Sequence, residues 1–193
     1  MKSFLAHWQL KRLADTESVP WRNGGGITHE LAVWPDAKDW QWRISVAEVA
    51  KAGPFSRFEG VDRQFAVLSG AGVRLALADS SVELTAQDAP FAFSGEETCD
   101  CQLLAGPTLD FNLMSKGMTA SLVRFTRSHF DGAAQAGDTV GCYAIEPVQV
   151  RMGDETREVP AHTLCWCMAP DSMPFHITGH SWLGWSLRPD SNR

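Results

Sequence analysis

An internal repeat is the feature of this sequence that most limits its fold. Residues 86–113 recur in degraded form as residues 160–187, at a constant offset of 74 residues. A repeat of this length predicts two similar structural modules in one chain. The first copy carries Asp110 and Asn112 where the second carries Gly184 and Ser186. Polar chemistry is therefore expected in the first module.

Short segments that alternate between apolar and polar residues predict β-strands, because successive side chains of a strand point to opposite faces. Turn-forming residues at 79–81 and 153–155 predict hairpins, and helical periodicity is weak and confined to 2–14 and 45–51. Many short strands in a duplicated chain predict an all-β protein of two jelly-roll barrels with few short helices. The expected strands are 27–33, 40–46, 64–68, 72–77 and 91–93, and then 142–145, 148–152, 164–167 and 182–187.

The repeat also predicts the domain organisation. We expect a first barrel over residues 1–115, which holds the ligand site, and a degenerate second barrel over residues 116–193. Residues 114–138 are rich in Ser, Gly, Ala and Asp and are expected to form the connector. Each repeat alone has only about 70–90 residues to bury, so the halves are expected to pack as one compact unit.

Composition excludes several classes of partner. The net charge is −6 and no basic block is present, which argues against nucleic acid and anionic membranes. The first residues lack the apolar core of a signal peptide, and no window is long and apolar enough to span a bilayer. The five cysteines are then expected to be reduced thiols in a cytoplasmic protein. A homodimer is left open.

One segment resembles the first signature of cupins, where two His and a Glu bind a metal ahead of a Val-Leu-x-Gly turn. Val67-Leu-Ser-Gly70 matches that turn, but residues 56–63 contain no histidine and Arg63 stands about where the Glu would be. A cation does not ligate a cation, so neither a metal nor another cofactor is expected. Arg63 can instead hold a carboxylate through its planar guanidinium. The alternative is a structural ion pair with Glu59 or Asp62.

Three pairs of polar residues occur at i, i+2 spacing within predicted strands, so each pair shares one strand face. Polar side chains inside a small barrel must bond to one another or to a ligand. The first pair follows three consecutive glycines at 24–26, which allow positive φ and a close approach of the backbone, in a site or simply in a flexible turn. The pairs are Thr28 with Glu30, Arg43 with Ser45, and Asp110 with Asn112.

Other reactive residues point to structural roles. Cys99 with Cys101, and Cys165 with Cys167, are separated by one residue, which suits two thiols on one buried strand face better than a zinc knuckle. His29 is expected to face away from Thr28 and Glu30, so a Ser-His-Asp triad is not supported.

Several motifs together resemble the HutD/Ves family, over about residues 20–115 and more loosely beyond. The resemblance implies a bicupin fold in cytoplasmic bacterial proteins. It also implies a regulatory role in histidine utilisation through binding formylglutamate or a related metabolite, and it brings no established catalytic activity. The second half diverges, with His162 where a glycine is expected, so no functional residue transfers to it. The motifs are Pro-Trp-Arg-Asn-Gly-Gly-Gly-x-Thr-x-Glu from Pro20, Trp-Arg-x-Ser at 42–45, Gly-Pro-Phe-Ser-x-Phe at 53–58 and Asp-Phe-Asn-Leu-Met at 110–114.

The sequence therefore predicts a metal-free bicupin whose first barrel binds a small anionic metabolite of amino-acid catabolism, such as an N-acylated glutamate, in a sensing role. Whether it is an enzyme stays open: the rival is a metal-independent isomerase, lyase or hydrolase with Glu30 or Asp110 as general base. A third possibility is a scaffold with the polar pairs locked in salt bridges. The predicted ligand-binding residues are Trp21, Asn23, Thr28, Glu30, Arg43, Ser45, Arg63, Asp110 and Asn112.

Overall fold

A computed structural model of the chain describes residues 7–190, apart from the side chain of Arg127. The described residues divide into a first unit, Thr16–Gly117, and a second unit, residues 7–15 with 118–190. The domain boundary between residues 115 and 116 stays a prediction, and residues 1–6 and 191–193 of the expected domains lie outside the described residues.

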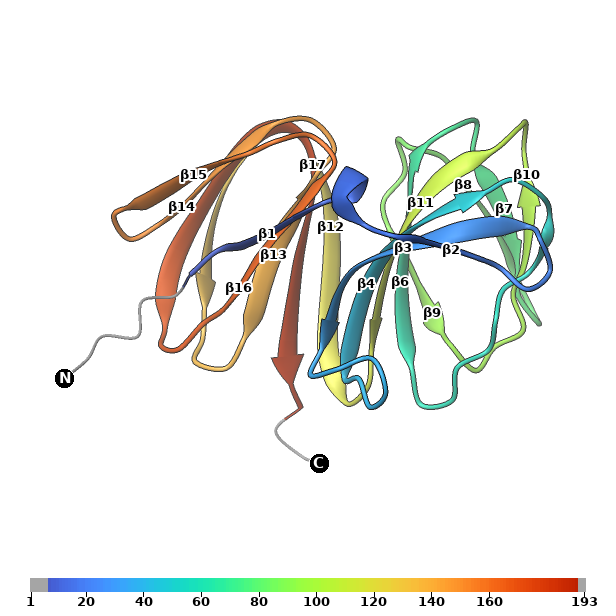
Figure 1. The fold of residues 1–193 in the computed structure, drawn as a ribbon, viewed down its shortest axis with the longest axis horizontal. Coiled ribbons are helices and arrows are strands. Elements are labelled where there is room, and N and C mark those ends of the chain that lie inside the picture. Colours follow the sequence, from blue (N-terminus) through green and yellow to red (C-terminus); the bar gives the residue numbers. More distant parts are fainter. Residues whose placement is uncertain (1–6, 191–193) are drawn as a thin grey trace. The chain divides into compact units, whose positions relative to one another are not determined.

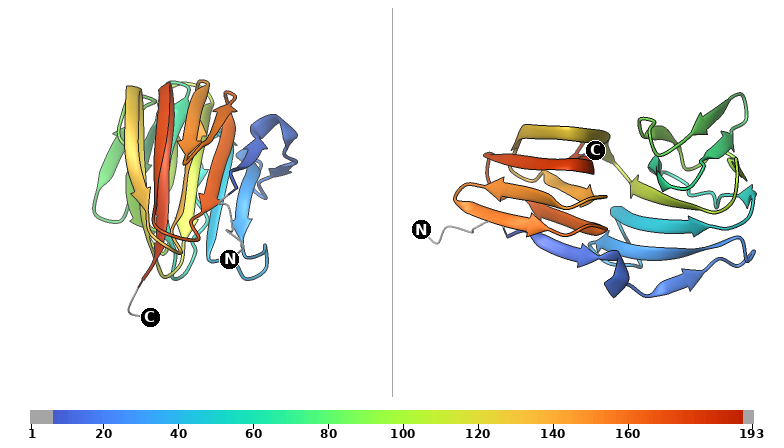
Figure 2. Two further views of the ribbon diagram at one scale, coloured as in Figure 1. Left: turned by 90° about the vertical axis from the view of Figure 1, so that its left-hand side faces the viewer. Right: turned by 90° about the horizontal axis from the view of Figure 1, so that it is seen from above.

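The first unit consists of two facing β-sheets (Figures 1 and 2). The larger sheet has the strand order β2-β3-β4-β11-β6-β9, and the smaller has the order β5-β10-β7-β8. Every pairing in both sheets is antiparallel. The strands are β2 (Ser18–Pro20), β3 (Gly26–Trp34), β4 (Trp42–Val49), β5 (Gly53–Pro54), β6 (Asp62–Ser69), β7 (Val73–Ala76), β8 (Ser81–Leu84), β9 (Phe91–Ser94), β10 (Asp100–Leu103) and β11 (Thr108–Ser115).

The second unit is one sheet that curls on itself, in the order β1-β16-β13-β17-β14-β15, with β12 also paired to β17 (Figure 2). Its first strand comes from the start of the chain and is followed by a single 3₁₀ turn, Leu13–Asp15. The strands are β1 (Gln9–Arg12), β12 (Met118–Ala134), β13 (Thr139–Ala144), β14 (Val148–Met152), β15 (Glu155–Val159), β16 (Thr163–Met168) and β17 (Met173–Pro189).

The two units share one pairing scheme, as the repeat predicts. The run β4-β11-β6-β9 of the first unit corresponds to β12-β17-β13-β16 of the second, and β10-β7-β8 corresponds to β17-β14-β15. The long strand β17 corresponds to both β10 and β11 of the first unit, because its first half pairs with β14 and its second half pairs with β13. The prediction of a duplicated all-β chain is confirmed.

Two predictions about local structure were wrong. Most of the expected connector at 114–138 is strand β12, which pairs with β17 along nearly its whole length. Residues 45–51, which showed weak helical periodicity, lie largely in strand β4. In both cases pairing with neighbouring strands outweighs local composition, as is usual for β-structure.

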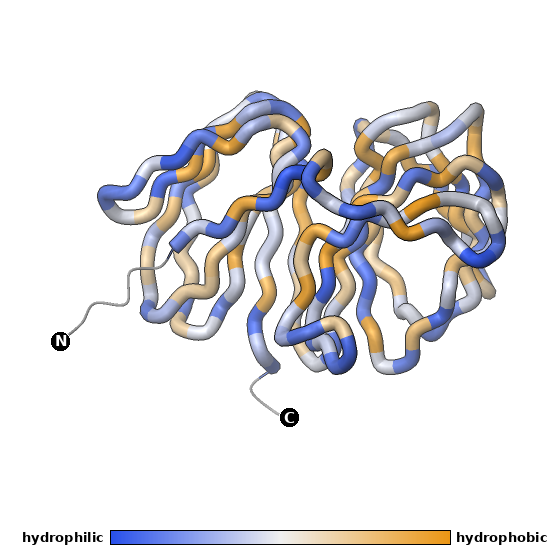
Figure 3. The backbone as a smooth tube through the Cα atoms, viewed as in Figure 1, coloured by the Kyte–Doolittle hydropathy of each residue, from blue (hydrophilic) through white to orange (hydrophobic). Residues whose placement is uncertain are grey.

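Hydrophobic residues concentrate along the strands and hydrophilic ones at turns such as the tip of the β14–β15 hairpin (Figure 3). The buried core of the first unit includes Cys99 and Cys101, and that of the second includes Cys165 and Cys167. The prediction that these thiols pack in the core is confirmed. Burial raises the pKa of both Cys101 and Cys167 to about 12, so neither is a reactive thiolate near neutral pH. No helix in residues 7–190 is long and apolar enough to cross a bilayer.

Candidate functional site

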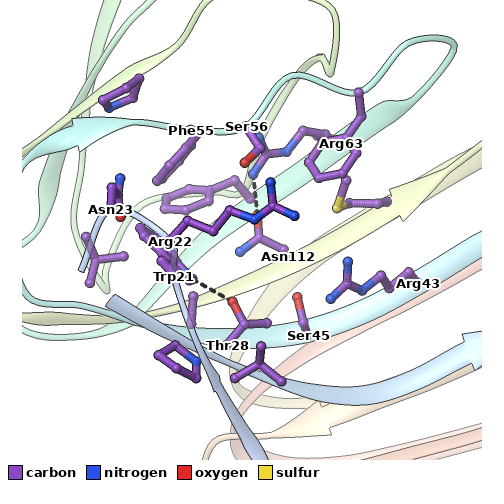
Figure 4. A pocket seen from close by; sticks show the side chains of 18 residues that line it. Trp21, Arg22, Asn23, Thr28, Arg43, Ser45, Phe55, Ser56, Arg63 and Asn112 are labelled. Carbon is purple, nitrogen blue, oxygen red and sulfur yellow. Dashed lines mark hydrogen bonds between the residues drawn. The ribbon is translucent and has the colours of Figure 1, made fainter. Parts of the chain in front are cut away.

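A cavity of about 650 Å³ opens into the interior of the first unit. Its walls come from the inner faces of β3, β4, β6 and β11, from the hairpin loop that joins β2 to β3, and from the segment after β5 (Figure 4). Apolar side chains form part of the wall, which suits binding of a small organic molecule. The apolar lining residues are Val19, Pro20, Ala47, Val49, Pro54, Phe55, Phe58, Phe65 and Met114.

Arg63 on β6 is a buried cation without a carboxylate partner in the described chain. Only 6% of the residue is exposed, and one Nη donates a hydrogen bond of 2.8 Å to the side-chain oxygen of Asn112. The guanidinium lies over the rings of Phe93 and Phe55, 4.7 and 5.1 Å from their centroids. Its Nε, also buried, has no hydrogen-bond partner. The expected alternative, an ion pair with Glu59 or Asp62, is not formed.

The burial of Arg63 carries an electrostatic cost. Loss of hydration lowers the pKa of its guanidinium to about 10, with a small opposing contribution from Cys99. Arg63 therefore remains a cation at neutral pH, and its burial is costly because no anion compensates the charge. An anionic ligand in the cavity would supply that missing charge.

Two further arginines line the same cavity, and they differ in whether a carboxylate lies next to the guanidinium. Arg43 on β4 has its Nε 2.7 Å from a carboxylate oxygen of Glu30, although the N–H does not point at that oxygen. Arg22, an exposed residue of the β2–β3 loop, forms no ion pair within residues 7–190 and extends toward the Arg63–Asn112 pair (Figure 4). Arg22 and Arg63 thus present two uncompensated positive charges to one space.

The glycine-rich loop shapes the rim of the cavity. Gly24 has φ +65°, and a Cβ on Gly26 would lie 2.3 Å from the backbone oxygen of Glu48, so a side chain there would push β3 away from β4. Trp21 closes the loop: its Nε1 donates to Thr28 Oγ1 at 2.7 Å, and its ring packs edge-on against Phe55. The loop is thus a structured hairpin turn that holds Trp21 and Arg22 at the cavity.

Asp110 is fully buried and does not line the cavity. Thr108 donates a hydrogen bond of 2.8 Å to one carboxylate oxygen, while the other oxygen has no partner. Burial raises the pKa of Asp110 to about 7, and the bond from Thr108 opposes that rise. The side chain lies close to Cys101, whose own pKa is raised partly by Asp110.

Seven of the nine predicted site residues line the cavity: Trp21, Asn23, Thr28, Arg43, Ser45, Arg63 and Asn112. Glu30 and Asp110 do not. Glu30 pairs across the sheet with Ser45 and so keeps the strand face that alternation predicts, but its carboxylate forms an ion pair with Arg43 and does not line the cavity. His29 lies on the other face, as expected, against Thr16 and Glu48.

Sequence reasoning did not select Arg22, Phe55 or Ser56, although all three stand inside motifs that carried the family resemblance. Arg22 lies between two selected residues in the glycine-rich loop, and Phe55 with Ser56 belongs to the Gly-Pro-Phe-Ser segment. Their side chains converge on Arg63 and Asn112 from segments that precede and follow β4 (Figure 4). Strand alternation could not find them because none of the three lies in a strand.

The cavity residues do not fit a transition metal. Its walls contain no His, Cys, Asp or Glu, and residues 7–190 hold no cluster of three such side chains that could ligate an ion. A buried guanidinium stands among the lining residues, and it repels cations. The donor set therefore suits an anion.

The sequence matches known proteins over most of its length. The family model HutD matches residues 13–185. The chain is 42% identical to Protein Ves of Escherichia fergusonii over 50% of this chain and 51% of that protein. It is 41% identical to an uncharacterized 21.2 kDa protein in the hutC 3' region of Pseudomonas putida, over 57% of this chain and 59% of that protein. The chain thus spans a little over half the length of these curated relatives.

Solved structures are similar over nearly the whole chain. HutD from Pseudomonas fluorescens SBW25 superposes with a TM-score of 0.83 at 25% identity, covering 94% of this chain and 98% of that one. An oxalate decarboxylase of Bacillus subtilis, only 9% identical, superposes with a TM-score of 0.64 over 94% of this chain and 77% of that one, which shows the fold alone. The prediction of a cupin β-barrel fold is confirmed.

Proposed function

The chain belongs to the HutD family, and we propose that the cavity of its first unit binds a small carboxylated metabolite as a sensor. The observation that carries the proposal is the buried, uncompensated charge of Arg63 at a cavity without acidic walls. A protein tolerates such a charge where function requires it, because burial without a counter-ion lowers stability. A carboxylate accepts two parallel hydrogen bonds from a guanidinium, and Arg63 uses only one of its two Nη groups in the bond to Asn112.

The size of the cavity and its second free cation indicate a ligand with more than one anionic group. A lone carboxylate would leave most of the 650 Å³ empty and Arg22 without a partner. Thr28, Ser45 and Ser56 offer hydroxyls between the two arginines, while Phe55 and Phe65 can contact a short aliphatic chain. An N-acylated glutamate has these parts. One relative lies beside hutC, which supports a place in histidine utilisation.

Thermal denaturation with candidate ligands tests the proposal. We expect N-formylglutamate, N-acetylglutamate or glutarate to raise the melting temperature, and the uncharged glutaramide to leave it unchanged. A ligand at 100 times its Kd adds about 2.7 kcal/mol to the free energy of unfolding. Arg63→Met should weaken binding about 100-fold or more, because it removes one partner of a buried charge pair. The same variant should unfold at a higher temperature without ligand, because its desolvation cost is gone.

Arg74→Met is the matched control, because Arg74 is an exposed arginine of the same unit that does not line the cavity. It should bind like the natural protein. An equal response to glutaramide, or full binding by Arg63→Met, would overturn the proposal.

The enzyme alternative has one observation in its favour, since the raised pKa of Asp110 would suit a general base near neutral pH. Asp110 does not line the cavity, however, and Glu30 is paired with Arg43. Mass spectrometry of each candidate ligand after prolonged incubation separates the two functions. Conversion that disappears in Glu30→Gln or Asp110→Asn would replace the sensor by an enzyme, and recovery of intact ligand supports the sensor.

A further inference from the structure

The second unit has a cavity of its own, of about 180 Å³, against β12, β13 and β17. It occupies the position that corresponds to the cavity of the first unit. The cross-strand pair Ser121–Ser186 contributes to its wall, just as the pair Ser45–Asn112 contributes to the wall of the other. Each copy of the repeat therefore contains a pocket at the equivalent place in its own unit, but different residues line the two pockets.

Aromatic rings form one wall of this second pocket. The ring of Phe125 stacks on the indole of Trp182 with centroids 4.0 Å apart and planes 7° from parallel, and Phe130 lies 5.1 Å from Phe125. Two glycines make room for these rings: a Cβ on Gly184 would lie 2.7 Å from the indole, and a Cβ on Gly132 would lie 2.7 Å from the ring of Phe130. The wall suits the flat face or edge of another aromatic ring.

The pocket offers no unpaired charge to a ligand. Its charged lining residues are Asp138 and Arg188, and Arg188 binds Asp138 through two hydrogen bonds of 2.8 and 3.0 Å. The hydrogen bonds from Arg188 hold the pKa of Asp138 below its usual value, so the pair stays ionised at neutral pH. The first cavity favours anions, whereas this one favours a neutral molecule.

One polar group of the wall lacks a partner. Trp182 is fully buried, and its indole N–H finds no acceptor within residues 7–190. A buried donor without an acceptor costs stability. The pocket is also accessible, because Val123 lines it and is 45% exposed. A small ligand can therefore reach the pocket.

We propose that this pocket binds a neutral, single-ring aromatic molecule that carries a hydrogen-bond acceptor. The volume agrees, since apolar cavities of about 150 Å³ in other proteins take up benzene. The ring packs against Phe125, Phe130 and Trp182, and the acceptor group meets the indole N–H of Trp182 or the hydroxyls of Ser121 and Ser186. This site is separate from the anion cavity of the first unit, and its occupancy does not depend on Arg63.

Titration with phenol, followed through the ¹H–¹⁵N signals of the tryptophan indoles, tests the site in the full chain. Trp182→Phe identifies the Trp182 signal by its disappearance. We expect that signal to move saturably with phenol and to stay in place with cyclohexanol, which has an acceptor but no aromatic ring. Val123→Phe adds bulk to the pocket wall and should weaken phenol binding at least tenfold. Arg63→Met should bind phenol like the natural protein.

Met168→Phe is the matched control, because Met168 is 43% exposed, lies in the same unit and does not line the pocket. It should leave phenol binding unchanged, and the spectra themselves show whether each variant is folded. The proposal is overturned if the Trp182 signal does not respond, if cyclohexanol moves it equally, or if Val123→Phe binds phenol as well as Met168→Phe does.

Discussion

The two units pair their strands alike, yet they surround different spaces. In the first unit Arg63 pairs across the sheet with Phe93, and in the second Val140 pairs with Cys167, which lies 74 residues after Phe93. The strand framework is thus kept while a cation is exchanged for an apolar side chain. The cavity of the first unit has a volume of about 650 Å³, whereas the corresponding cavity of the second unit, with different wall residues, has about 180 Å³.

A second difference between the units concerns two residues at i, i+2 spacing on one strand. Thr108 and Asp110 of the first unit stand where the repeat places Trp182 and Gly184 in the second. The small hydroxyl of Thr108 bonds to the Asp110 carboxylate, whereas the Trp182 ring packs over a glycine that has no side chain. A duplicated barrel can thus turn a polar interior into a packed one through a few coordinated changes of inward-facing residues.

The largest expected difference between the units concerns aromatic side chains. Trp182→Ala should lower the free energy of unfolding by about 3–5 kcal/mol, since it removes a fully buried ring and its stack on Phe125. Phe55→Ala, at the half-buried wall of the first cavity, should cost only about 1–2 kcal/mol, and its main effect should be on ligand affinity. Urea unfolding of both variants checks this. Equal losses would mean that the first cavity is as tightly packed as the second.

The next effect concerns Asp110, a buried carboxylate of the first unit that has no cationic partner within residues 7–190, unlike the buried Asp138 of the second unit. The pKa of Asp110 is raised to about 7 from its ordinary value of 3.8, so the folded chain keeps a proton that the unfolded chain has released. The stability contributed by Asp110 is therefore greatest at low pH and declines as pH rises through 7. Between pH 5 and 8 the loss should be about 2–3 kcal/mol.

Asp110→Asn isolates that contribution from other titrating groups. Urea unfolding at pH 5 and at pH 8 should show the natural protein losing about 2–3 kcal/mol more than the variant does. A variant whose pH dependence matches that of the natural protein would show that Asp110 ionises normally.

A smaller effect concerns close contacts of the backbone. Gly26→Ala should lower stability by about 2 kcal/mol, because the new Cβ would meet the Glu48 carbonyl at 2.3 Å and push two strands apart. Gly141→Ala should do the same in the second unit, where the Cys165 carbonyl lies 2.3 Å away. Gly24→Ala serves as the reference and should cost only about 1 kcal/mol, for its left-handed φ in open space. If all three variants cost the same, the close approach has no influence.

The smallest effect on stability concerns the partly exposed ion pair of the first cavity. Glu30→Gln should change the free energy of unfolding by less than about 1 kcal/mol. It should nevertheless tighten binding of a carboxylated ligand, because Arg43 loses its neutralising partner and adds a third positive charge to the cavity. Calorimetric titration with N-acetylglutamate measures the change. Weaker binding would show that Glu30 itself contacts the ligand.

Strand prediction succeeded where alternation was clear and failed at edges. Val148–Met152 was predicted with its bounds, and the hairpin turns at 79–81 and 153–155 lie where expected. The short edge strands β1, β2 and β5 were not predicted, although the four-residue strands β7 and β9 were, so length alone does not explain the failures. The divergent His162 does adopt φ +53°, a conformation that favours glycine.

The sequence alone determined that this chain is a duplicated all-β protein of the cupin type, with its polar interior in the first copy. Those properties follow from periodicity and from residue identity, which are local. The folded structure was needed to show that Arg63 has no counter-ion within residues 7–190, that Glu30 is paired with Arg43, and that Arg22 extends toward Arg63. These facts depend on which side chains meet across strands and loops, and the linear order of residues does not encode such distances.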